Sequence, residues 1–153
     1  MKKKWITTIL SVLFITLTSV AGTDYKEKEV EMKDLPTIAQ EFITNHFAQY
    51  AVNNTRVVKY GYYKVNLNDG YEILFDRKGK WNEIENKMHT ALPASVVALL
   101  PANTTNYLSE KYPQWTIYGI ERNKHGYEVE LHGDKKIELH FDPNGNFLRE
   151  KAD

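Results

Sequence analysis

The sequence predicts an α+β fold of two tandem repeats, each a helix followed by a four-stranded antiparallel meander sheet. Two observations carry the prediction. First, the stretch 63–81, YKVNLNDGYEILFDRKGKW, returns in altered form at 127–147 as YEVELHGDKKIELHFDPNGNF. In both copies apolar residues alternate with polar ones, which is the period of a strand with one buried face. Second, a Leu-Pro pair followed by apolar residues at helical spacing precedes each copy.

The start of the chain predicts an export signal over residues 1–21. It has a basic head at 2–4, an uncharged apolar run at 5–20 and a small-residue cleavage site at 19–21. The alternative is an uncleaved anchor, but spanning a bilayer needs roughly twenty mostly apolar residues, and this run is shorter and diluted by Thr and Ser. We therefore expect a periplasmic or secreted protein that is free of the membrane after cleavage.

Composition excludes several classes of function. Removing the signal leaves 17 basic residues against 20 acidic ones, a net charge of −3. An acidic chain without a basic cluster is a poor ligand for nucleic acid. There is no cysteine, so no disulfide and no thiol nucleophile exist. No serine-nucleophile or phosphate-loop motif is present either, so we expect a protein that is not an enzyme and needs no cofactor. We also expect it to be a monomer.

The elements follow in order. Residues 22–34 form a charged N-terminal segment, 35–87 the first repeat and 88–153 the second, and both repeats are expected to share one compact unit. In the first repeat a helix begins near Leu35-Pro36, followed by a polar connection at 51–56 and a short strand at 57–60. The first helix buries one face, which comprises Ile38, Ala39, Phe42, Ile43, Phe47 and Tyr50.

The second repeat begins with an equivalent helix. It follows Pro101, contains Tyr107, Leu108 and Tyr112, and must end before Pro113. Its first strand is expected at 115–122.

The hairpins have a predicted register. A three-residue loop ending in Gly70 suits a hairpin with a left-handed glycine. This loop places Val65 opposite Ile73. The remaining expected apolar pairs are Tyr63 with Phe75, Leu67 with Tyr71, Tyr127 with Phe141, Val129 with Leu139, and Leu131 with Ile137. Each hairpin then enters a turn of type I chemistry, 76–79 or 142–145, before one further strand.

These repeated residues resemble the PepSY-like, beta-lactamase-inhibitor-like secreted domains of bacteria. The resemblance spans about 35–149 and rests on the Leu-Pro pairs, the Tyr-x-Val strands, the Phe-Asp turns and the aromatic after each turn glycine. It implies a beta-lactamase-inhibitor-like fold without known catalytic apparatus, in which an open sheet surface binds a target protein. It assigns no contact residue to this chain.

The register predicts which side chains lie on the face that the helices leave open, and we take this face as the candidate binding site. The candidate residues are Tyr62, Lys64, Glu72, Leu74, Glu128, Glu130, His132, Glu138 and His140. Asn66, Ile84, Lys136 and Leu148 are expected on the same face. In the second hairpin, Glu128 should stand opposite His140, Glu130 opposite Glu138, and His132 opposite Lys136.

Two functions from different classes follow from this face. The first is a non-catalytic binding module for a protein or peptide of the bacterial envelope, of which an enzyme inhibitor is a specific version. The alternative is a small-ligand or divalent-cation sensor that uses Glu130, Glu138 and His140, with Glu128 or His132, because carboxylates and imidazole ligate divalent ions. Against a metal stands the absence of any compact metal motif in the sequence.

Overall fold

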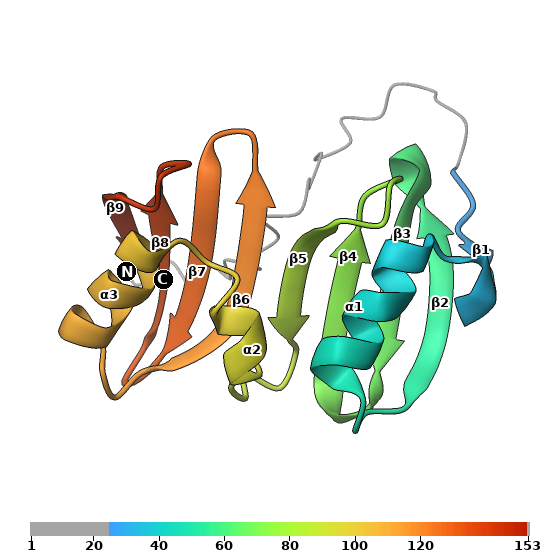
Figure 1. The fold of residues 1–153 in the computed structure, drawn as a ribbon. Coiled ribbons are helices and arrows are strands. Elements are labelled where there is room, and N and C mark those ends of the chain that lie inside the picture. Colours follow the sequence, from blue (N-terminus) through green and yellow to red (C-terminus); the bar gives the residue numbers. More distant parts are fainter. Residues whose placement is uncertain (1–24, 153) are drawn as a thin grey trace, which may run out of the picture.

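The computed structural model describes residues 25–152, so the predicted signal peptide at 1–21 lies outside the described part. The chain forms a nine-stranded antiparallel sheet in which every strand pairs with its neighbours in sequence, in the order β1 to β9. The helices α1, α2 and α3 lie on one face of this sheet (Figure 1). None of the described helices is both long and apolar enough to cross a membrane.

The strands are β1 Lys28–Glu29, β2 Val52–Val58, β3 Tyr62–Leu67, β4 Tyr71–Phe75, β5 Trp81–Asn86, β6 Thr116–Asn123, β7 Gly126–His132, β8 Lys136–Phe141 and β9 Phe147–Ala152. The α-helices are α1 Thr37–Phe47, α2 Ala94–Val97 and α3 Ala102–Lys111. Single 3₁₀ turns occupy Met32–Asp34, Lys59–Gly61 and Asn68–Gly70. Pro36, Pro93 and Pro101 each stand immediately before an α-helix, since a proline has no N–H to leave unsatisfied there.

The core lies between the helices and one face of the sheet. Helix α1 buries Ala39, Ile43 and Phe47, as its apolar spacing predicts, and α3 buries Thr104 and Leu108. Ile38, expected on the same buried face, is instead 52% exposed, because it lies on the opposite side of the helix from Ile43 and Phe47. The alternating apolar residues of β3, β4, β7 and β8 meet them from the sheet. Burial of one face of the sheet leaves the opposite face for polar side chains.

Both hairpins have the predicted register. Val65 pairs with Ile73 and Tyr63 with Phe75 in the first. In the second, all three apolar pairs and all three polar pairs form as expected. Gly70 has a φ of +85°, the left-handed conformation that the loop requires.

Three details differ from the prediction. The sheet has nine strands, because the N-terminal segment contributes β1 as an edge strand. Strand β2 begins at Val52, so the expected polar connection at 51–56 is mostly strand; pairing with β3 outweighs the low strand propensity of its asparagines. Ile84 lies in the core opposite Ile73, because a bulge between Leu74 and Phe75 reverses the faces in β5.

The two helix–turn contacts are alike. A Cβ built on Gly79 would lie 2.7 Å from Pro36 Cβ, and one built on Gly145 would lie 2.5 Å from Pro101 Cβ. In each turn an Asp side chain accepts hydrogen bonds from backbone N–H groups two and four residues later. Each turn therefore presses its glycine against the start of the preceding helix.

Candidate functional site

The open face of the sheet is organised as two rows of side chains that cross the strands in register. The first row contains, from β3 to β9, Lys64, Leu74, Glu83, Glu121, Glu128, His140 and Arg149. The second row contains Asn66, Glu72, Glu85, Gly119, Glu130, Glu138 and Lys151. Neighbours in a row are within reach of each other, because opposed residues in antiparallel strands have Cβ atoms about 5 Å apart.

The structure brings seven of the nine candidate residues into these rows: Lys64, Glu72, Leu74, Glu128, Glu130, Glu138 and His140. The other two lie beside the rows on the same strands. Tyr62 pairs with Val58 at the start of β3, and His132 pairs with Lys136 at the far end of the second hairpin. Leu148 is an unpaired, exposed residue at the bulge between β8 and β9.

Three acidic residues of the rows were missing from the prediction: Glu83, Glu85 and Glu121. A bulge in the β4–β5 ladder decides the face that Glu83 and Glu85 occupy, and Glu121 lies on the same face because it pairs with Glu83. The alternation Glu83-Ile84-Glu85 could have revealed two of them, because it places an apolar residue between two acids at strand period.

In the first half of the face, lysines form ion pairs with two of the acids, Glu72 and Glu85. The Lys64 Nζ lies 3.5 Å from Glu72 Oε1, and the Lys87 Nζ lies 3.6 Å from the same oxygen and also contacts Glu85. Asn66 Nδ2 donates a 2.8 Å hydrogen bond to Glu72 Oε2. Burial alone would raise the pKa of Glu72, but the two lysine charges and this hydrogen bond lower it overall.

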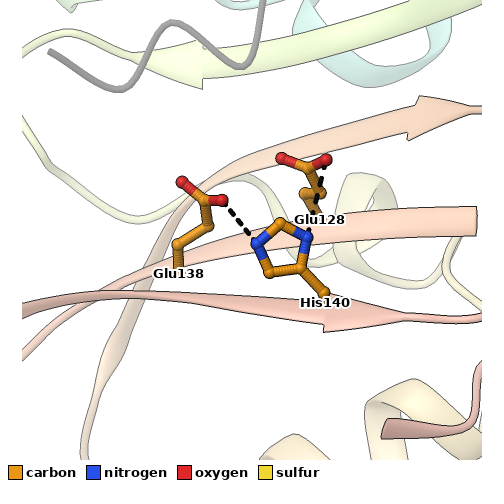
Figure 2. A group of neighbouring side chains, drawn as sticks. All are labelled: Glu128, Glu138 and His140. Atoms are coloured by element: carbon orange, nitrogen blue, oxygen red, sulfur yellow. Dashed lines mark ion pairs between the residues drawn. The ribbon is translucent and has the colours of Figure 1, made fainter. Parts of the chain in front are cut away.

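In the second half, the partner of the acids is a histidine. His140 Nε2 lies 2.6 Å from Glu138 Oε1, and its Nδ1 lies 3.6 Å from Glu128 Oε1 (Figure 2). Asn123 donates a further hydrogen bond of 3.2 Å to Glu128. The three residues Glu128, Glu138 and His140 form the Glu–Glu–His cluster, whose ligand atoms all lie within 4.8 Å of one another.

The acids at the centre of the face bind protons more tightly than ordinary glutamates. Burial, with the charges of Glu85, Glu83 and Glu138, raises the pKa of Glu130 to about 9. Burial, with Glu121 and Glu85, raises the pKa of Glu83 to about 8. Such values arise because a desolvated carboxylate among other carboxylates is costly to ionise.

His132 stands apart from the Glu–Glu–His cluster. Its ring centroid is 5.8 Å from that of His89, which also packs on Tyr118 and has its Nε2 3.1 Å from Lys136 Nζ. Partial burial, together with the charge of Lys136, lowers the pKa of His89. His132 thus lies at the turn end of the second hairpin, away from the pair of Glu128 and His140.

The geometry of the open face suits binding of positive charge. In the Glu–Glu–His cluster, the potential ligands are two carboxylates and one imidazole, held on neighbouring strands with their side chains toward one another. Within residues 25–152 we find no arrangement of nucleophile, base and orienting group on this face.

A family model described as "Putative beta-lactamase-inhibitor-like, PepSY-like" matches residues 61–149. This chain belongs to that family. The match covers most of both hairpins and their following turns, and the description names an inhibitor-like protein without a catalytic reaction. No curated protein sequence matches the chain.

Solved structures from Bacteroides show the same fold. A "putative calcium-regulated periplasmic protein" of Bacteroides thetaiotaomicron is 32% identical with a TM-score of 0.72, over 82% of this chain and 97% of that one. Two proteins of Bacteroides vulgatus, both described as putative periplasmic proteins, are 32% and 30% identical, with TM-scores of 0.75 and 0.73. The matches cover 86% and 83% of this chain and all of theirs. All three of these relatives are thus described as periplasmic.

Proposed function

We propose that this protein is an exported, non-catalytic binding module whose open sheet face captures a basic protein or peptide of the bacterial envelope. The single observation that carries the proposal is the pair of rows, in which seven glutamates from β4 to β8 share one face. A ligand rich in Lys or Arg would supply the positive charge that these carboxylates favour. Inhibition of a secreted enzyme is one form that such capture could take.

Membership of an inhibitor-like family and the periplasmic description of the relatives support export and binding without turnover. In this proposal the protein acts as a monomer. The two halves, 35–87 and 88–153, are copies of one helix-plus-meander unit. The matching contacts of Gly79 with Pro36 and Gly145 with Pro101 support the duplication, since each copy closes its turn on its helix in the same way.

The test is capture from native envelope extract by the full chain, compared with a variant in which Glu130, Glu138 and His140 are changed to Gln. A control variant carries Glu41→Gln and Glu110→Gln, which lie exposed on the helices. We expect a protein retained by the wild type and the control and lost by the triple variant. The affinity of this chain for that protein, measured by direct titration, should then fall as salt is added. Equal retention by all three chains would contradict the proposal.

A second candidate function is the binding of a divalent cation on the same face. The description of the Bacteroides thetaiotaomicron relative as calcium-regulated favours it, together with the oxygen ligands of the two rows, since Ca²⁺ binds carboxylate oxygens. A cation that binds only the folded chain raises its melting temperature. The test is thermal unfolding with and without Ca²⁺ or Zn²⁺ at constant ionic strength, with Mg²⁺ as a comparison. An unchanged melting temperature with all three ions would remove this candidate.

A further inference from the structure

The Glu–Glu–His cluster differs from the rest of the open face because it combines oxygen and nitrogen ligands. His140 lies between two carboxylates, with one ring nitrogen turned toward each of them: Glu138 precedes it by two residues on β8, and Glu128 is its cross-strand partner on β7 (Figure 2). Two ligands that share an ion at about 2.1 Å are separated by about 3.4 Å, so the 4.8 Å span of this cluster needs only small side-chain rotations. Two carboxylates and a neutral imidazole also balance the charge of a divalent cation.

A separate observation concerns two buried polar atoms near this cluster. Glu130 pairs with Glu138 in the second row and is only 4% exposed, yet its Oε2 has no hydrogen-bond partner among the described residues. His140 Nε2 also lacks a hydrogen-bond partner: it lies close to Glu138, but the two groups are not aligned for a hydrogen bond. Buried polar atoms are normally satisfied, so a positive ligand would complete the chemistry of each of these two atoms. Glu130 Oε2 lies on the β6 side of the cluster, where a Cβ built on Gly119 would be 2.6 Å from it.

We propose that Glu128, Glu138 and His140 form a site for a divalent cation that accepts imidazole, of the Zn²⁺ class. This inference rests on the second candidate function and names its ligands and its cation. Zn²⁺ favours mixed nitrogen and oxygen ligands at tetrahedral geometry, whereas Ca²⁺ takes six to eight oxygens and gains nothing from the imidazole.

The neighbouring strand limits the site on one side. His140 and Glu138 pair with Arg149 and Lys151 of β9, whose side chains are exposed. These two basic residues occupy the β9 side of the cluster. The carboxylates therefore gather on the other side, toward β6 and β7. A cation bound there would also lie closest to Glu121 and Glu130 in the rows.

The test is calorimetric titration of the full chain, free of any histidine tag, with Zn²⁺ alone and with Ca²⁺ alone. His140→Asn should weaken Zn²⁺ binding by about tenfold or more, because it removes the only imidazole of the cluster. The matched control is His132→Asn on the neighbouring strand, which should leave Zn²⁺ binding within about twofold. His140→Asn should also leave any Ca²⁺ binding unchanged.

A second readout does not depend on a variant. Zn²⁺ added to the wild-type chain should shift the NMR signals of the His140 ring and leave those of His132 in place. Zn²⁺ binding that is insensitive to His140→Asn, or that is lost with His132→Asn, would overturn the proposed ligand set. Binding of Ca²⁺ without Zn²⁺ would keep cation binding as a function but overturn this site, and binding of neither ion would remove both.

Discussion

The two halves of this protein match on the helix side of the sheet and differ on the open side. On the helix side, each turn glycine touches the proline that starts the helix of its own half. On the open side, Glu72 and Glu85 of the first half are paired with Lys64 and Lys87, whereas Glu128 and Glu138 of the second half meet His140. The packed face therefore fixes the architecture, while the open face can change its charge without changing the fold.

The largest expected effect tests the likeness of the two helix sides. Gly79→Ala and Gly145→Ala each place a Cβ against a proline ring, at positions where φ is +84°. We expect each to lower the free energy of unfolding by about 3 kcal/mol, since strain at positive φ adds to the steric overlap. Urea unfolding of both variants measures it. A loss below about 1 kcal/mol in one half only would show that its helix contact is not equivalent.

The next effect concerns the second half of the open face. Glu130 has a folded-state pKa of about 9, against an ordinary value of 4.5. A raised pKa means that its contribution to stability is complete below about pH 4.5 and is lost as the pH rises through 9. Glu130→Gln removes this loss, so at pH 8 we expect the free energy of unfolding of the variant to exceed that of the wild type by on the order of 2 kcal/mol.

The measurement is the melting temperature of both chains from pH 5 to pH 9. The difference between them should be small at pH 5 and grow toward pH 9. Comparing the two chains cancels the titration of other groups, such as His89, whose pKa is lowered. A wild-type curve parallel to that of the variant would show that Glu130 ionises as an ordinary glutamate.

A smaller effect marks a difference within the helix sides. Thr104 Oγ1 donates a buried hydrogen bond of 3.1 Å to the carbonyl of Gly145, whereas Ala39 packs near Gly79 in the first half. Thr104→Ala should therefore lower the free energy of unfolding by about 1.5 kcal/mol, because the buried carbonyl loses its hydrogen-bond donor. Thr104→Ser keeps the hydroxyl and serves as the control in urea unfolding. If the serine variant loses as much as the alanine variant, packing of the methyl group accounts for the cost.

Local patterns were enough to predict much of this arrangement. Alternation and turn residues determined both hairpins, and with them the meeting of Glu128, Glu138 and His140, because a hairpin register depends on residues close in sequence. The β-bulges could not be predicted from local sequence patterns. They depend on pairing between strands, and they carried Ile84 into the core and brought Glu83 and Glu85 to the open face.

The smallest expected effect tests the first half of the open face. Lys87 lies between Glu72 and Glu85, and these acids hold its pKa above the ordinary value although burial opposes this. Lys87→Met removes the shared cation, so we expect a loss of about 1 kcal/mol at pH 7, limited because the lysine is partly exposed to solvent. Lys124→Met, at an exposed position of the turn between β6 and β7, is the control.

The same variant should make the first half behave as the second half does. Without Lys87, the pKa of Glu72 is expected to rise, because the largest of the charges that lower it has gone. NMR titration of the Glu72 carboxyl carbon measures this directly. If that pKa stays low in Lys87→Met, then Lys64 and Asn66 suffice to hold the charge, and the contrast between the two halves rests on these β3 residues rather than on Lys87.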